Sequence, residues 1–269
     1  MNLSKGNPLG KGQFHSAGSV ADVSLMGDLQ AFRRRVAGAY RSVKPGELTQ
    51  SILGGPFHVS PKVDGELWFL ILEGTDAWLV SSNGKVISGE IPLLQEARSM
   101  AGNCSGRVVV AGELFAAPTG KSRARVGDVA SALAGGAAAQ VERLGFMAFD
   151  LVGGLLPVAP AACPYEQRLE ALTSLMRTGK RVRVVRTDVV GSAADIAPVF
   201  AELVEGGKAE GLIIRSAQGV IYKVKPEFTV DAAIIGYTVR TEDPNAVRSL
   251  LFGLTREDGG TQIVGHCGN

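Results

Sequence analysis

The spacing of hydrophobic and polar positions changes several times along the 269-residue chain. Short apolar or alternating runs, typical of β-strands, occupy residues 67–72, 77–81, 85–87, 107–115, 145–152, 212–214 and 220–224. Asn83-Gly84 lies between two of these runs and predicts a hairpin turn. Residues 181–190 alternate Arg and Val, which predicts one strand with a solvent-exposed face.

Helical patterns lie between these runs and do not alternate strictly with them. They predict helices over residues 24–42, 92–101, 127–143, 164–176 and 193–205, the third interrupted at Gly135-Gly136. Pro92 suits the first position of its helix. Strands and helices mixed in this way favour the α+β class.

The composition and the pattern also describe the two ends of the chain, and the division at residue 226 is the one that the family resemblance given below implies. Residues 1–23 are rich in Gly, Ser, Asn and Lys, which predicts a flexible N-terminal segment. Residues 24–226 are expected to form one folded domain. Residues 227–269 contain three further strand-like runs and are expected to form a second, smaller unit.

Composition changes this picture little. The net charge is +2, so any basic surface for nucleic acid must be local. No run approaches the roughly 20 apolar residues that span a bilayer, and the N-terminus lacks the apolar core of a secretory signal. The three cysteines are far apart, which favours a reduced, cytoplasmic (intracellular) protein without a zinc ribbon.

The first candidate for chemistry is Lys62, in the run HVSPKVDG at residues 58–65. A lysine between a strand and an Asp-Gly turn holds its amine at a fixed place, and a neutral amine is a nucleophile. Alone, Lys-x-Asp-Gly is a weak signal. Four further runs follow it in order, namely GELF at 112–115, FMAFD at 146–150, EGLIIR at 210–215 and YKVKP at 222–226.

Together the five runs resemble the ordered motif set of the ATP-dependent polynucleotide (DNA/RNA) ligases, within the covalent nucleotidyltransferase superfamily that also holds mRNA capping enzymes. The resemblance covers roughly residues 55–265. It implies a nucleotidyltransferase (adenylation, ATP-grasp-like ligase) domain over residues 24–226, followed by the start of an OB-fold β-barrel over residues 227–269. The family's last motif, a basic segment later in that barrel, is absent from the sequence.

The resemblance also implies the chemistry. Lys62 would attack the α-phosphate of ATP, expel pyrophosphate and carry AMP. Lys223 and Lys225 lie two residues apart, so they share one face of a strand. In the family this pair contacts the α-phosphate. Their charge would favour a neutral Lys62 and stabilise the transition state.

Five further residues match family positions. Glu113 would contact the ribose, and Glu210 would bind the nucleotide and support a divalent metal such as Mg²⁺. Phe149 would stack on the adenine, although a core position is the competing interpretation because Phe146 is equally apolar. Asp64 and Gly65 would shape the turn after the nucleophile and so contribute to nucleotide binding.

Three positions depart from the DNA-ligase pattern. DNA ligases usually have Arg where this chain has Leu67, and often have Glu and Arg where it has Ser60 and Ser82. Some RNA ligases also have Leu at the position of Leu67. Arg181 and Arg183 are candidates for nucleic-acid binding in place of the missing arginines, through backbone phosphates.

The resemblance therefore implies an ATP- and Mg²⁺-dependent DNA ligase that seals 5′-phosphate/3′-hydroxyl nicks in duplex DNA during repair or replication. Three alternatives remain open: an ATP-dependent RNA ligase, a GTP-dependent capping enzyme, and a catalytically degenerate module that binds nucleotide or nucleic acid. No membrane partner is expected, and the sequence leaves the oligomeric state open.

Overall fold

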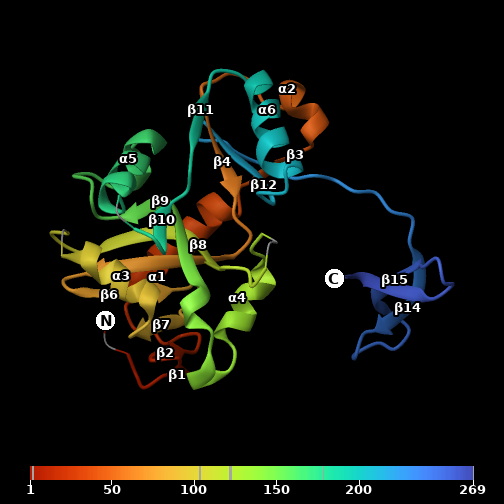
Figure 1. The fold of residues 1–269 in the computed structure, drawn as a ribbon, viewed down its shortest axis with the longest axis horizontal. Helices are drawn as coiled ribbons and strands as arrows, with labels where there is room; N and C mark the ends of the chain where they lie inside the picture. The colour runs from red at the N-terminus through yellow and green to blue at the C-terminus, as the bar shows by residue number, and fades with distance from the viewer. Residues whose placement is uncertain (2, 103, 121–122, 178, 269) are drawn as a thin grey trace. The chain divides into compact units, whose positions relative to one another are not determined.

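The computed structural model describes residues 1, 3–102, 104–120, 123–177 and 179–268. The chain divides into two compact units, Met1–Pro226 and Glu227–Asn269 (Figure 1). Within the described ranges, no helix has the length and apolar character that crossing a bilayer requires. The first unit contains two sheets, and each has its own hydrophobic core.

The larger sheet has eight strands among the described residues. Their order is β1 (Asn7–Leu9), β2 (Gly12–His15), β7 (Val86–Gly89), β6 (Asp76–Val80), β5 (Glu66–Glu73), β8 (Val108–Ala116), β9 (Leu144–Gly153) and β10 (Val182–Val184). Neighbouring strands are antiparallel, except that β10 runs parallel to β9. The hairpin predicted at Asn83-Gly84 connects β6 to β7, and Gly84 has the positive φ of 78° that such a turn requires.

The N-terminal segment is part of this sheet, so the prediction of a flexible segment over residues 1–23 is wrong for strands β1 and β2. Strand β2 pairs with β7, with Gln13 opposite Ser88. Leu9 and His15 are buried by this pairing. The Gly- and Ser-rich composition concealed the strands because each is only three or four residues long.

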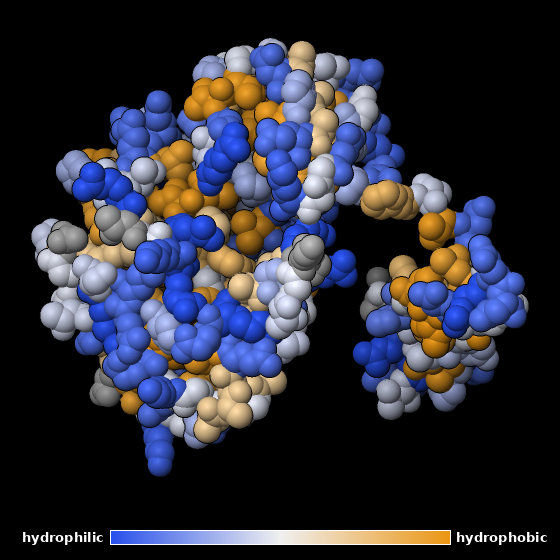
Figure 2. Space-filling model, in the orientation of Figure 1, coloured by the Kyte–Doolittle hydropathy of each residue, from blue (hydrophilic) through white to orange (hydrophobic). Residues whose placement is uncertain are grey.

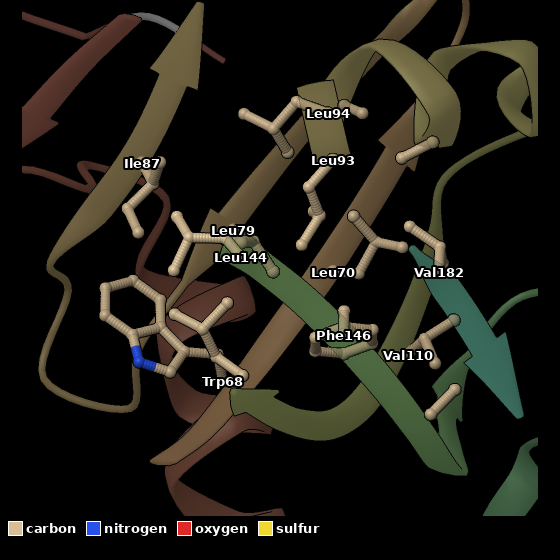
Figure 3. Packing of buried hydrophobic residues seen from close by; sticks show 14 of the residues in the cluster. Trp68, Leu70, Leu79, Ile87, Leu93, Leu94, Val110, Leu144, Phe146 and Val182 are labelled. Atoms are coloured by element: carbon tan, nitrogen blue, oxygen red, sulfur yellow. The ribbon is translucent and has the colours of Figure 1, made fainter. Parts of the chain in front are cut away.

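Helices pack on both faces of the larger sheet. Helix α3 (Pro92–Ala101) covers one face, where Leu93 and Leu94 belong to the same buried cluster as Trp68, Leu70 and Phe146 (Figure 3). Helix α1 (Val23–Phe32) packs on the other face. It continues as one π-helical turn, Arg33–Ala37, and then stops. The helix predicted over residues 24–42 is therefore too long, because Arg41–Val43 forms strand β3 of the smaller sheet.

The smaller sheet has five strands in the order β11 (Asp188–Val190), β4 (Phe57–Lys62), β12 (Gly211–Ser216), β13 (Ile221–Val224) and β3. Its outer face is covered by α2 (Leu48–Ser51), α6 (Ile196–Phe200) and the π-helical turn Ala201–Glu205. Its inner face carries the side chains that matter for function. Phe57, Val59, Leu212, Ile214, Tyr222 and Val224 point outward into the core, so the alternate residues point inward.

The single strand predicted over residues 181–190 is two strands in different sheets. Strand β10 completes the larger sheet beside β9, and β11 begins the smaller sheet beside β4. Val182 is buried in one core, whereas Val190 packs against the other. Residues 185–187 thus cross from one sheet to the other, which places Val185 between them.

Two further helices belong to the first unit. Helix α4 (Val126–Leu133) is followed by two 3₁₀ turns, Gly136–Ala138 and Val141–Arg143. The break predicted at Gly135-Gly136 is confirmed, since both glycines have positive φ. Helix α5 (Tyr165–Leu175) packs on β9.

The second unit is a three-stranded antiparallel sheet of β14 (Ala233–Val239), β15 (Val247–Thr255) and β16 (Thr261–Gly268). The three strand-like runs expected in this segment are confirmed. Many of its apolar side chains, including Ile234, Tyr237 and Ile263, are exposed. The assignment of this sheet to the start of an OB-fold stays a prediction.

Candidate active site

A cavity lies between the two sheets of the first unit. The smaller sheet and the residue after β4 contribute Ser60, Pro61, Lys62, Val63, Ile213 and Arg215, and the larger sheet contributes Leu67, Glu113, Met147 and Phe149, with Tyr40 and Val185 completing the lining. Its empty volume, which includes space open to solvent, is about 620 Å³. In Figure 2 a hollow with hydrophobic residues opens between the two sheet layers.

Strand register explains why these side chains meet. In the smaller sheet Ser60 lies opposite Ile213, and Lys62 lies opposite Gly211. In the larger sheet Leu67 lies opposite Glu113, and Glu113 lies opposite Met147. Side chains directly opposite each other project from the same face of a sheet, so two rows face each other across the cavity.

Lys62 ends strand β4, and its ammonium donates a hydrogen bond to Glu210. The Lys62 Nζ to Glu210 Oε2 distance is 2.5 Å. Lys225 donates to the other oxygen of the same carboxylate, so Glu210 bridges two lysines. Burial raises the pKa of Glu210, but the hydrogen bonds from Lys225 and Lys62 outweigh it, and the net pKa is below its ordinary value. Glu210 is therefore a carboxylate that partly neutralises the lysine pair.

Glu113 lies across the cavity from this group and is electrostatically different. Burial raises its pKa to about 7, and the neighbouring Glu210 charge adds to the rise. The Lys62 charge and a hydrogen bond from the Gly65 backbone N–H oppose it. Near neutral pH this carboxyl thus exists in both protonation states, so it can accept or donate a hydrogen bond to a bound ligand.

Gly65 and Asp64 shape the turn after Lys62 without lining the cavity. A Cβ on Gly65 would lie 2.3 Å from the backbone oxygen of Leu114, so a side chain does not fit there. Asp64 pairs with Arg123 at 2.8 Å and accepts the backbone N–H of Val126 at 3.3 Å. The Asp-Gly turn that follows β4 thus packs closely on β8 and is hydrogen-bonded to the start of α4.

The structure separates the two candidate aromatic residues. Phe146 is fully buried in the core beneath α3. Phe149 is on the other face of β9, lines the cavity and lies 5.7 Å from the Arg215 guanidinium. Its ring also lies 6.4 Å from that of Phe32. Of the two rings, Phe149 is therefore the one that faces the cavity.

The remaining predicted residues lie near the cavity rather than in its lining. Lys223 is opposite Ile213 in the register of β13 and β12. Arg183 is exposed and lies beside Met147, so it extends the row of Leu67, Glu113 and Met147. Arg181 does not line the cavity, and its guanidinium donates hydrogen bonds to the backbone oxygen and the carboxylate of Glu142.

Sequence reasoning missed several lining residues. Tyr40, Met147, Val185, Ile213 and Arg215 were assigned no role, although they form much of the wall. Two of them carried a usable signal, because Ile213 and Arg215 alternate with the buried Leu212 and Ile214 and so had to face the other way. Tyr40 lies between the π-helical turn and β3, and Val185 lies between β10 and β11, in connections where no periodicity indicates direction.

The side chains around this cavity could hold a magnesium ion only if a bound nucleotide supplied further ligands. No group of three or more acidic, His or Cys side chains among the described residues is arranged to hold a metal. Mg²⁺ in nucleotide enzymes is commonly bound by one or two carboxylates plus substrate phosphates. Glu210 supplies one such carboxylate, and both of its oxygens are now engaged by lysines.

A lysine thus lines an apolar cavity between two sheets, and a carboxylate bridges it to a second lysine. The scaffold is the α+β fold of a nucleotidyltransferase domain. The family model described as "ATP dependent DNA ligase domain" matches residues 39–227, more than half of the chain. The chain belongs to this family. None of the curated proteins matches the chain.

Solved structures confirm the fold. A structure described as "Pmar-Lig_Pre." matches at 15% identity with a TM-score of 0.66, covering 86% of this chain and 56% of that one. A structure of mycobacterial DNA ligase D with ATP and MES matches at 20% identity with a TM-score of 0.52, covering 87% of this chain and 73% of that one. This chain thus spans little more than half the length of the first relative.

Proposed function

We propose that this chain forms a lysyl-AMP intermediate on Lys62 and serves ATP-dependent ligation of nicked DNA. The bridge from Lys62 through Glu210 to Lys225, beside a cavity that both sheets of the first unit line, carries the proposal. The enclosed apolar walls suit a purine, and the lysines suit its phosphates.

The nucleotide orientation follows from the lining. Phe149 would stack on the adenine, and Glu113 would bind the ribose from the facing row. Lys62, Lys223 and Lys225 would then meet the α-phosphate at the end of the cavity. Mg²⁺, bound with the nucleotide by Glu210, would supply charge neutralisation of the phosphates.

The reaction requires Lys62 to release to solvent water the proton that it now donates to Glu210. Its nitrogen lone pair would then attack the α-phosphorus, forming the N–P bond. The bond between the α-phosphorus and the bridging oxygen would break, and its electron pair would leave with pyrophosphate. Lys225 would remain beside the developing negative charge and stabilise it. AMP would next pass to a 5′-phosphate, and a 3′-hydroxyl would displace it.

Nucleic-acid contact is assigned to the first unit. Residues 227–269 carry three arginines against six carboxylates, so this segment repels a phosphate backbone. Arg183 is exposed and lies on the cavity face of the larger sheet. It is therefore the better of the two arginines predicted for strand contact, and Arg181 has the weaker support because Glu142 engages it.

RNA ligation is the second candidate, and Leu67 favours it. Leu67 lines the cavity at the position where DNA ligases usually have an arginine, so one polar contact to nucleotide or nucleic acid is missing. Sealing of matched nicks with a deoxyribose or a ribose 3′-terminal strand distinguishes the two. Faster sealing of the ribose nick would assign the chain to RNA.

Intact-mass measurement after incubation with ATP and Mg²⁺ tests the proposal, with Lys62→Ala and Lys223→Ala beside the wild type. We expect the mass of one AMP on the wild type and none on Lys62→Ala. If no adduct forms, pre-adenylated nicked DNA and RNA are supplied. Failure to seal either would leave only a binding module for this chain.

A further inference from the structure

A second cavity adjoins the nucleotide cavity, and the adenylation chemistry does not use it. It lies between the π-helical turn after α1, the start of β4, the N-terminus of α5 and the β12–β13 turn. Its empty volume is about 1160 Å³, and its lining includes Arg35, His58, Tyr165, Glu166, Arg168 and Arg215. Arg215 lines both cavities.

Arg215 is a buried cation without a carboxylate partner. Its relative exposure is 4%, and its Nε has no hydrogen-bond partner among the described residues. The guanidinium lies 5.7 Å from the Phe149 ring, which lines the nucleotide cavity, and 4.5 Å from the Tyr165 ring, which lines the second. The buried carboxylate of Asp150 lines the second cavity too, but it pairs with Arg168 at 2.6 Å.

An uncompensated guanidinium is unfavourable inside a protein, because burial removes its hydration. Two aromatic faces recover part of that loss through cation–π attraction, yet they leave the Nε–H donor without an acceptor. A position of this kind is stable when a ligand supplies an acceptor. The orphaned Nε therefore indicates that something anionic binds beside Arg215.

The charges around the second cavity favour an anion. Arg168 and Asp150 neutralise each other. Arg35 is exposed at the rim, and no ion pair found between described residues includes it or Arg215. Glu166 is the one opposing carboxylate in the lining beyond Asp150. Two unpaired arginines thus face one exposed glutamate, and arginine forks match the geometry of phosphate oxygens.

We propose that this second cavity binds a phosphate group, held by Arg215 on the inside and Arg35 at the rim. The site does not depend on nucleotide transfer to Lys62. A backbone phosphate of a nucleic-acid strand and a free phosphate share the required chemistry, so the experiment must separate these two sources.

Arginine footprinting with phenylglyoxal tests the site on the whole chain. Modification of Arg35 and Arg33 is quantified by peptide mass spectrometry, alone, with inorganic phosphate, and with a 5′-phosphorylated oligonucleotide. Arg33 is the matched control, because it lies on the same turn but bonds Ser82 and does not line the cavity. We expect at least five-fold greater protection of Arg35 than of Arg33.

The probes identify the source. Protection by both assigns the site to any phosphate, and protection by the oligonucleotide alone assigns it to a strand. Equal protection of Arg33 and Arg35, or protection of neither, would overturn the proposal. Arg215→Lys keeps the positive charge but loses the paired N–H donors of the guanidinium, and we expect at least five-fold weaker protection of Arg35. Unchanged protection in a folded Arg215→Lys chain would also overturn it.

Discussion

Lys62 and Glu210 are 148 residues apart, yet their side chains meet at 2.5 Å. The antiparallel pairing of β4 with β12 brings them together, since Gly211 lies opposite Lys62 and the Glu210 backbone N–H donates to the Lys62 carbonyl. Strand β13 then adds Lys225 from the next position in the sheet. Three neighbouring strands thus bring the proposed nucleophile, its carboxylate partner and a second cation to one point.

Replacement of Glu210 by Gln should slow AMP transfer to Lys62 without unfolding the chain. The amide keeps the shape but loses the charge that bridges two lysines and the carboxylate available to a metal. We expect the initial rate of adduct formation to fall about 10²–10³-fold, the usual loss when one preorganised electrostatic group is removed. Mass spectrometry over time measures the rate, and the melting temperature is the control. A wild-type rate would exclude Glu210 from the reaction.

The raised pKa of Glu113 should make stability depend on pH. Its carboxyl binds a proton more tightly in the folded chain, where the pKa is about 7, than in the unfolded chain, where it is near 4.5. Stability contributed by this proton is complete below pH 4.5 and is lost as pH rises toward 7, by at most about 3 kcal/mol.

Urea unfolding at pH 5 and pH 7.5 measures this dependence. Glu113→Gln cannot titrate, so its stability should fall less than that of the wild type between the two pH values. Parallel pH profiles for the two chains would show that Glu113 titrates normally.

Gly65→Ala should destabilise the chain by about 1–3 kcal/mol, the usual cost of overpacking. The new Cβ would lie 2.3 Å from the Leu114 carbonyl oxygen, and the turn would have to move away from Glu113. Gly127→Ala is the matched control, because nothing lies within 4 Å of its added Cβ in helix α4. Chemical denaturation should show a loss for the first variant only. Equal stabilities would mean that the turn is not tightly packed.

Arg183→Ala should weaken binding to a nicked duplex and lower the salt dependence of that binding. One lost phosphate contact reduces the slope of log K against log salt by about 1. Fluorescence anisotropy at several salt concentrations measures the slope. Lys208→Ala removes an equal charge from the end of the outer layer of the smaller sheet, and its slope should match the wild type. An unchanged slope for Arg183→Ala would remove this residue from the nucleic-acid surface.

Several elements could be predicted from local sequence. Helix α3, the β6–β7 hairpin and the strands around Lys62 were found because their signals lie within a few residues: a proline at the helix start, an Asn-Gly turn and clear apolar runs. The order of the motifs also predicted that Lys62, Glu113 and Glu210 belong to one site. The family resemblance supplies this long-range information, which periodicity lacks.

Other features depended on partners distant in sequence. Strands β1 and β2 form because β7 accepts β2 at the sheet edge, and nothing within residues 1–23 indicates that partner. The alternation over residues 181–190 is the same whether these residues form a strand of one sheet or strands of two sheets. The crossing at residues 185–187 therefore could not be predicted from it. Phe146 and Phe149 have equal hydrophobicity, and only the strand's orientation separates core from cavity.

The sequence by itself determined the class of fold, and it indicated Lys62 as the candidate nucleophile together with the charged residues proposed to accompany it, because local periodicity and ordered motifs encode these. Only the tertiary structure decided which faces meet. It enclosed the cavity between two sheets, turned Arg181 toward Glu142 while leaving Arg183 exposed, and left Arg215 buried without a carboxylate. Burial and pairing are properties of residues brought together across the whole chain, so no single segment contains them.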